Sequence, residues 1–346
     1  MSNNRRQIKR FPLPDLLKGL AAFFMVQIHI TELFLDNAGR ESLFGRVSLF
    51  LGGPFAAVVF MVVMGYFIAK NKNTTSQNLL RGMKIFILGL LLNIGLNFHL
   101  LLKIKFSGWQ YNPLEYIFGV DILFLAGMSI IVLSLLKSLN KGQGWVALIL
   151  LLAVSGLTSV MNEHLTVSYQ NYLLPFIAGT YSWSYFPLFP WLAYPLAGFV
   201  FALFEEKIKL FFTQQKAIVA VILTSIALTV ILFSRQGIST TINLPSYYHH
   251  TFRYSLWALG LVLCWLLLLR LLLKKFPGSR LGNFMCWIGK NITLFYVIQW
   301  LLIGNIATAI YQTQGIDRYF FWFGGIFTIT VLFTFLLEKV NLKLLR

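Results

Sequence analysis

The stretch "DLLKGLAAFFMVQIHITELFL", residues 15 to 35, begins with Asp15 and holds Lys18, His29 and Glu32 among the apolar residues of a segment of helix length. A neutral imidazole can remove a proton from a hydroxyl or an amine, and a neighbouring carboxylate can fix its tautomer and stabilise the charge that it acquires. A cation such as Lys18 can neutralise a phosphate. The three residue types therefore predict proton transfer beside a phosphate-bearing ligand.

Helical geometry aligns these side chains. At about 100° per residue, Lys18 and His29 return to within about 20° of one face, about 16 Å apart along the axis, so we expect them to point into one cavity. Glu32, three residues further, shares that face. Lys18 lies in the first turn, where it can reach the headgroups and pair with Asp15. An ionisable group at the depth of His29 costs about 2.5 to 3.5 kcal/mol on insertion scales, which favours function. The alternative is a histidine that only hydrogen-bonds to another helix.

The elements that position these residues are membrane helices. The chain has 346 residues, of which 58% are hydrophobic and 12% charged, a composition that excludes an ordinary soluble domain. We predict an all-α, polytopic integral membrane protein with about ten transmembrane helices in one membrane domain, residues 1–346. Nine to eleven spans are compatible, because the fifth is short and the region 171 to 186 is ambiguous. The ten apolar stretches are 15 to 35, 48 to 69, 82 to 102, 116 to 136, 144 to 160, 187 to 204, 216 to 234, 253 to 273, 291 to 310 and 319 to 337.

The net charge of +18 is a topology signal. Placing the loops alternately on two sides puts 22 of the 29 Lys and Arg on the side of the N-terminus. The positive-inside rule then predicts that both termini are cytoplasmic, in a bacterial inner membrane, with anionic lipid as a partner and no nucleic acid. Only two cysteines occur, Cys264 and Cys286, so no disulfide framework is expected.

Other candidate residues lie outside the first span. Asp121 is placed well inside the fourth predicted span, in its outer half, and ranks second to His29 because an acid at that depth needs a polar cavity or a cation. Arg81, Lys84 and Lys290 lie in or beside basic inward loops that could hold the phosphates of a cytosolic cofactor, with topology as the alternative explanation.

A metal site is not expected. His249 and His250 are adjacent, and neighbours diverge by about 100° on a helix. Their loop, 235 to 252, and the loop 161 to 186 are rich in Tyr, Ser, Thr and Asn. Aromatic faces and hydroxyls suit a polyhydroxylated ligand, while an interfacial aromatic belt is the simpler interpretation.

Four stretches resemble membrane acyltransferases. "DLLKGLAAFFMVQIH" is similar to their first-span signature, in which an acidic residue and Arg-Gly precede an apolar run and a His eleven positions after the Arg. "GGPFAAVVFMVVMGYFI", "FPLFPWLAYPLAGF" and "GKNITLFYVIQ" resemble later motifs, in the expected order. The chain thus resembles acyltransferase-3 proteins and, more closely, bacterial relatives of the lysosomal heparan-α-glucosaminide N-acetyltransferase.

The resemblance implies transfer of an acyl group, usually acetyl, from cytosolic acyl-CoA to a hydroxyl or amine of a glycan at the outer face. It places the candidate catalytic group on His29, with Glu32 and Asp121 as further candidates, and a donor-binding cation on Lys18. His29 can act as general base in direct transfer or form an acyl-histidine. The sequence leaves open the acceptor, the acyl chain and the oligomeric state, with a homodimer among the options.

Three positions depart from the family pattern. Lys18 stands where an Arg is usual, Met64 where many relatives have Ser, and Gln299 where some have His. Two rival functions remain. A secondary transporter or flippase would use the buried ionisable residues as a proton or substrate path, and a catalytically silent relative would only bind a glycan or a partner.

Overall fold

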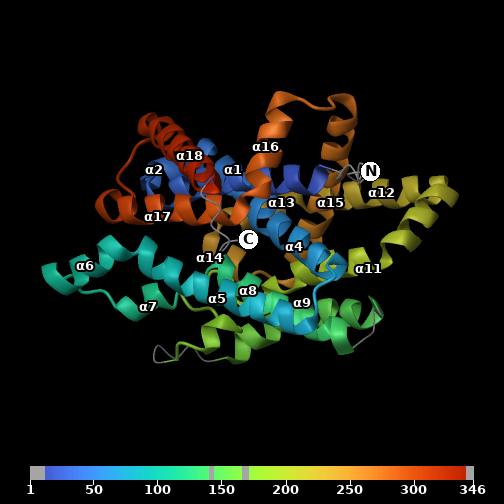
Figure 1. Ribbon diagram of the computed structural model, residues 1–346, viewed down its shortest axis with the longest axis horizontal. Coiled ribbons are helices and arrows are strands. Elements are labelled where there is room, and N and C mark those ends of the chain that lie inside the picture. The colour runs from blue at the N-terminus through green and yellow to red at the C-terminus, as the bar shows by residue number, and fades with distance from the viewer. Residues whose placement is uncertain (1–11, 140–143, 166–170, 340–346) are drawn as a thin grey trace, which may run out of the picture.

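The computed structural model describes residues 12–139, 144–165 and 171–339, and the regular secondary structure of this part of the chain is helical, with two isolated β-bridges, Leu35 with Gln314 and Val120 with Ser184. Within it, nine helices are long and apolar enough to cross a membrane, or ten if a bent pair forms one span. The prediction of an all-α, polytopic membrane protein is confirmed (Figure 1).

The helices, in chain order, are α1 (Leu13–Leu33), α2 (Asn37–Glu41), α3 (Leu43–Gly52), the π-helix η1 (Gly53–Val58), α4 (Val59–Lys70), α5 (Thr75–Leu96), α6 (Phe98–Ser107), α7 (Pro113–Ile117), α8 (Ile122–Leu139), α9 (Gly144–His164), the 3-10 helix η2 (Leu174–Phe176), α10 (Leu188–Trp191), α11 (Ala193–Gln214), α12 (Lys216–Leu232), α13 (Ser234–Ile242), α14 (Leu244–Tyr248), α15 (Phe252–Lys275), α16 (Arg280–Lys290), α17 (Ile292–Ile310) and α18 (Ile316–Lys339).

Three spans differ from their predicted form. The second, α3 to α4, is a continuous 28-residue segment, and Pro54 falls in its π-helical part, where a widened turn accommodates the missing backbone N–H. The fifth is a full 21-residue helix, α9. The seventh is broken, because α12 and α13 meet at 56°. The ambiguous region 171 to 186 is not a span, since its described helical part is only η2.

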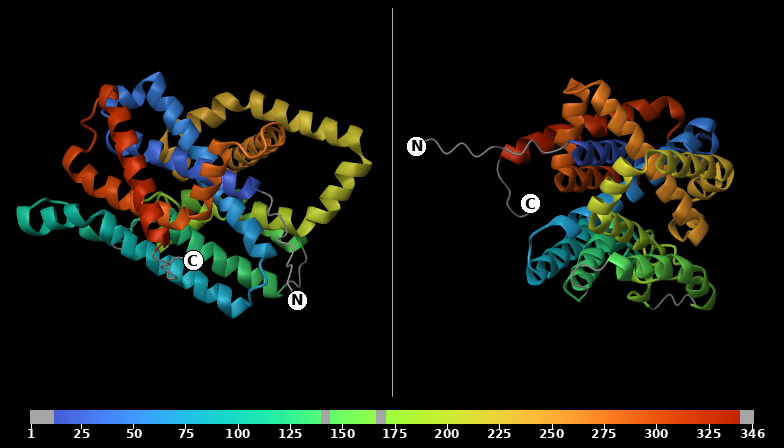
Figure 2. Two further views of the ribbon diagram at one scale, coloured as in Figure 1. Left: turned by 45° about the horizontal axis from the view of Figure 1, so that its top comes forward. Right: turned by 90° about the vertical axis from the view of Figure 1, so that its right-hand side faces the viewer.

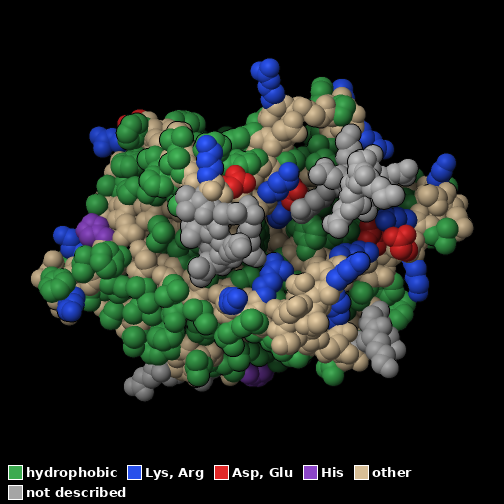
Figure 3. All heavy atoms as spheres, in the orientation of Figure 1, with side chains coloured by type: hydrophobic (Ala, Val, Ile, Leu, Met, Phe, Trp, Pro, Cys, Tyr) green, Lys and Arg blue, Asp and Glu red, His purple; other side chains and the backbone are tan. Residues whose placement is uncertain are grey.

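The connections alternate between two ends of the bundle, as the sequence predicts. At one end, Lys70 of α4 pairs with Glu205 of α11 (2.6 Å), and Lys137 of α8 donates to the backbone carbonyl of Asn71 (2.7 Å). We call this the basic end. The start of α1 joins it through α16, whose Trp287 indole donates to Glu338 at the end of α18 (2.8 Å). In Figure 3, Lys and Arg gather toward this part of the molecule.

The opposite end, here the far end, brings together the end of α1 and the α17–α18 connection. There the backbone N–H of Gln314 donates to the carbonyl of Phe34 (2.9 Å). On another side of the bundle, the Asn93 amide of α5 donates to the carbonyl of Gly119 before α8 (2.7 Å). That the basic end faces the cytoplasm stays a prediction.

Helix α1 is the centre of one half of the bundle, where it packs against α3, η1, α16, α17 and α18. Helices α5, α8 and α9 form the other half, and α4 with α11 lies between (Figure 2). Glycines set the closest crossings. A Cβ at Gly19 would collide with the backbone of Met285 on α16, and one at Gly65 or Gly198 would collide with the α11 or α4 backbone. The glycines of two of the quoted motifs therefore allow α4 and α11 to touch.

Candidate active site

His29 lies on α1 and faces α17. Its Nδ1 is 3.2 Å from Oε1 of Gln299, and its ring stacks on Trp300 with centroids 3.9 Å apart and planes tilted by 32°. The side chain is partly buried and keeps part of its accessible surface. With Oε1 accepting, the proton resides on Nδ1, and Nε2 carries a lone pair that can take a proton.

Gln299 has a donor to spare. The residue is 1% exposed, and its Nε2 has no hydrogen-bond partner among the described residues. An unmade hydrogen bond at a buried amide costs about 1–3 kcal/mol, so a ligand that completes this bond would be stabilised here. Because the other end of this amide holds His29, the open N–H group lies beside the imidazole.

Glu32, one turn beyond His29, has a different partner from the one its spacing suggested. The Tyr248 hydroxyl of α14 donates to its two carboxylate oxygens at 3.2 and 3.4 Å. Arg40 and Asp121 are near enough to act on Glu32 electrostatically. In the described structure, therefore, the residue that orients the imidazole is Gln299, and the carboxylate of Glu32 lies toward the far end.

Asp121 is not inside a span as the sequence predicted. It directly precedes α8, where one carboxylate oxygen accepts the backbone N–H of Ile122 (2.7 Å) and the other accepts the Tyr296 hydroxyl (2.5 Å). Tyr296 lies one turn before Gln299 and Trp300 on α17. One face of α17 thus links the carboxylate of Asp121 to the imidazole of His29.

Trp191 and His250 hold the segment that carries Tyr248, the partner of Glu32. The indole of Trp191 donates to the carbonyl of Tyr248 (2.8 Å) and so fixes the segment whose hydroxyl reaches Glu32. His250 Nε2 lies 2.7 Å from the Tyr194 hydroxyl, and its Nδ1 lies 2.7 Å from the carbonyl of Tyr247. Burial lowers the pKa of His250 to about 3, so it is neutral at pH 7. His250 is therefore a structural histidine, and no group of three or more His, Cys, Asp or Glu in the described chain could hold a metal ion.

The predicted donor-binding cations lie apart from His29. Lys18 pairs with Asp15 (2.9 Å) and lies 5.7 Å from the ring centroid of Phe67, so it faces α4, whereas His29 faces α17. Arg81 and Lys84 are exposed on α5, and Lys290 is exposed in the last turn of α16. None of these last three forms an ion pair with another residue that the structure describes.

Sequence reasoning missed the aromatic partners of the site. Trp300 and Tyr296 stand within or beside the quoted motif "GKNITLFYVIQ", and their spacing of four residues places them on the face that also carries Gln299. Tyr248 was visible only as part of a Tyr-rich loop. The sequence feature that could have indicated the site residues of α17 is Gln299, a polar residue in the middle of an apolar helix.

Comparison with protein families matches residues 12–339 to the acyltransferase-3 family, described as an acyltransferase domain. Neither the search of curated proteins nor the search of solved structures found a match.

Proposed function

Since the chain belongs to the acyltransferase-3 family, we propose that it moves an acyl group, acetyl in the simplest case, from cytosolic acyl-CoA to a hydroxyl or amine of a carbohydrate outside the cytoplasm. The observation that carries this proposal is His29, a partly accessible imidazole inside the bundle whose Nδ1 proton is held by Gln299. The proposed relationship to heparan-α-glucosaminide N-acetyltransferases rests on the sequence motifs alone.

The proposed reaction is direct transfer. Nε2 of His29 removes the proton of the acceptor hydroxyl or amine as that atom bonds to the acyl carbon. The carbon–sulfur bond then breaks, and the proton passes from His29 to the departing CoA thiolate. Gln299 stabilises the imidazolium through Nδ1, and its open Nε2 N–H group donates to the carbonyl oxygen as negative charge develops there.

The donor would enter from the basic end. Its phosphates carry negative charge, and the exposed Arg81, Lys84 and Lys290 offer cations without ion-pair partners in the described chain. Lys18 lies further in, about 16 Å from His29 along α1, which suits a donor whose charged head stays outside while its acyl arm extends inward. The topology that places this end in the cytoplasm, in a bacterial inner membrane, follows from the positive-inside rule.

The acceptor would enter from the far end. Glu32 and Tyr248 lie on that side of His29, and Asp121 is near enough to Glu32 to act on it electrostatically. Their oxygens can form hydrogen bonds with sugar hydroxyls.

The test is acyl transfer by the purified protein in lipid nanodiscs. Labelled acetyl-CoA and an envelope glycan fraction are supplied, and both glycan labelling and release of the CoA thiol are measured. His29→Ala should lower transfer by about 10³-fold, within the range for loss of a general acid–base group.

His99→Ala is the matched control. His99 is also a partly buried histidine, but it bonds to Asn305 between α6 and α17 and has no place in the proposed reaction. It should retain near-normal transfer with an equal chromatographic profile. Full activity of His29→Ala would refute the assignment, and glycan movement without CoA release would favour a transporter.

A further inference from the structure

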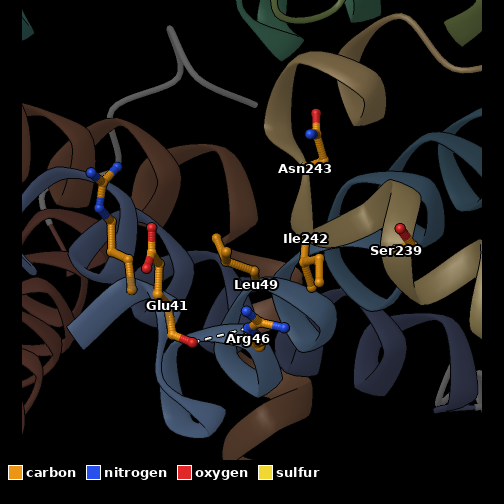
Figure 4. Close-up of a pocket in the computed structure, with 7 residues that line it drawn as sticks. Glu41, Arg46, Leu49, Ser239, Ile242 and Asn243 are labelled. Atoms are coloured by element: carbon orange, nitrogen blue, oxygen red, sulfur yellow. Dashed lines mark hydrogen bonds between the residues drawn. The ribbon is translucent and has the colours of Figure 1, made fainter. Parts of the chain in front are cut away.

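A groove of about 270 Å³ lies at the far end of the bundle (Figure 4). One wall comes from α2 and α3 and carries Arg40 and Arg46. The other comes from α13 and the residue that caps α14, with Ser239, Ile242 and Asn243. In Figure 4 the Arg46 guanidinium points from α3 toward the wall that carries Ile242. The groove thus combines two cations with the carboxylate of Glu41, a hydroxyl and an amide.

Two helix caps and a glycine fix the turn between α2 and α3. Asp36 caps α2 by accepting the N–H of Gly39 (2.7 Å), and Ser42 caps α3 by accepting the N–H of Gly45 (3.1 Å). A Cβ at Gly45 would collide with the backbone carbonyls of Gly39 and Arg40. Only glycine permits this close turn, which sets the two arginine-bearing helices against each other.

The two guanidinium groups have unused donors. Arg40 donates through Nη2 to the side chains of Asn37 and Gln312, the latter at 3.0 Å, but its solvent-shielded Nε has no partner among the described residues. Arg46 donates through Nε to the backbone carbonyl of Glu41 (2.9 Å). In the described chain neither guanidinium forms an ion pair with an acid. The carboxylate of Glu41 also lines the groove, so the two arginines leave one formal positive charge in excess there.

The groove is connected to the candidate active site by one side chain. Gln312 accepts from Arg40, and its own amide donates to the backbone carbonyl of Glu32 (3.2 Å). Glu32 lies one turn from His29 on α1. The groove and the imidazole therefore lie at the same end of α1, joined by the contacts of Gln312.

We propose that this groove binds a carboxylate of the acceptor, and hence that the acceptor is an acidic glycan containing a uronic acid. The planar fork of a guanidinium matches a carboxylate, which can take two parallel hydrogen bonds. Ser239 and Asn243 on the facing wall suit the hydroxyls of the same sugar. The inference rests on the proposed function, because it supplies the substrate class of that reaction.

The test measures binding in the His29→Ala protein, so that it does not depend on turnover. The probes are an oligogalacturonate and the same oligomer with its carboxylates reduced to alcohols, titrated into protein in neutral phosphatidylcholine nanodiscs. We expect the acidic oligomer to bind about tenfold more tightly, with an affinity that falls as salt is added.

Arg46→Gln should abolish this preference, and Arg46→Lys should retain part of it. Arg318→Gln is the matched control, since it removes one arginine at the far end but outside the groove. Equal binding of the two oligomers, or equal loss in the Arg46 and Arg318 variants, would overturn the proposal. Displacement of the oligomer by phosphatidylglycerol vesicles would also overturn it, because the groove would then be a lipid headgroup site. Failure of acetyl transfer alone would count against the proposed function and leave this readout intact.

Discussion

Two polar clusters lie on neighbouring positions of the same helix and are built differently. Gln27 and Thr31 of α1 face Ser48 of α3. The Gln27 amide donates to the Ser48 backbone carbonyl (2.8 Å) and accepts the Ser48 hydroxyl, which also lies 2.5 Å from the hydroxyl of Thr31. The Tyr319 hydroxyl of α18 donates to the backbone carbonyl of Gln27 (3.1 Å). Both ends of this amide are therefore used.

The cluster around His29 uses only one end of its amide. Gln299 is more deeply buried than Gln27, yet its Nε2 has no partner in the described part of the chain. A closed network holds three helices in register, because removing any member leaves a buried group unpaired. An open one costs stability unless something else completes the bond. The contrast separates polar residues that hold α1 in place from those available to a substrate.

Gln299→Met gives the largest effect within this comparison. Methionine fills a similar volume without hydrogen bonds, so transfer should fall by about 100-fold, as for loss of one donor to a developing oxyanion. The melting temperature should change little, because the substitution removes the unpaired Nε2 donor of Gln299 but also leaves Nδ1 of His29 without its acceptor. The measurement is the turnover number together with a thermal unfolding curve. A lower melting temperature with normal turnover would make Gln299 a structural residue like Gln27.

Gln27→Met should show the opposite pattern. It leaves the hydroxyl and carbonyl of Ser48 without their partner, which should lower the free energy of unfolding by about 2 kcal/mol. The folded fraction should still transfer acyl groups at close to the normal rate. Thermal unfolding and turnover per folded molecule decide the matter. A large loss of turnover at unchanged stability would mean that the closed network also takes part in the reaction.

The sequence predicts which segments are helical, but it does not predict the first residue of every helix. Apolar runs predicted the spans and their alternation, but the fourth run continued through Asp121, whereas α8 begins only at Ile122. The cause is a contact far away in the chain. The N–H of Val120 donates to the carbonyl of Trp183 (2.7 Å), which holds this stretch in a bridge outside the helix. Hydropathy cannot register such a contact.

The candidate site was predictable on α1 and not beyond it. Periodicity placed His29 and Glu32 one turn apart, but their partners, Gln299 and Tyr248, lie 270 and 216 positions further along the chain. Spacing along one helix cannot select among residues of other helices. It suggested Glu32 as the partner of the imidazole, and the structure assigns that place to an uncharged amide.

A further prediction concerns how stability depends on pH through another closed cluster, the one around His250. Burial holds the pKa of His250 at about 3, below its usual value of about 6.5, so the unfolded chain takes up the proton first. Its contribution to stability is complete above about pH 6.5 and is lost as the pH falls toward 3, by about 1.4 kcal/mol per pH unit. Melting temperatures between pH 7 and pH 5 should fall less steeply in His250→Gln than in the wild type. Parallel curves would mean that His250 is already exposed to protons in the folded protein.

The smallest expected effect is that of Tyr248→Phe, and the neighbouring residue, Tyr247, provides a matched control. The Tyr248 hydroxyl donates to Glu32, so its removal should lower transfer by about 3- to 10-fold, equivalent to about 1 kcal/mol. Tyr247→Phe deletes the same atom one residue earlier, from a buried hydroxyl that has no partner among the described residues. This control should leave transfer unchanged and stability equal or slightly higher. Kinetics with saturating acetyl-CoA and varied acceptor distinguish the two. Equal losses in both variants would show that the segment matters through packing alone, and that the hydrogen bond to Glu32 contributes nothing to acceptor binding.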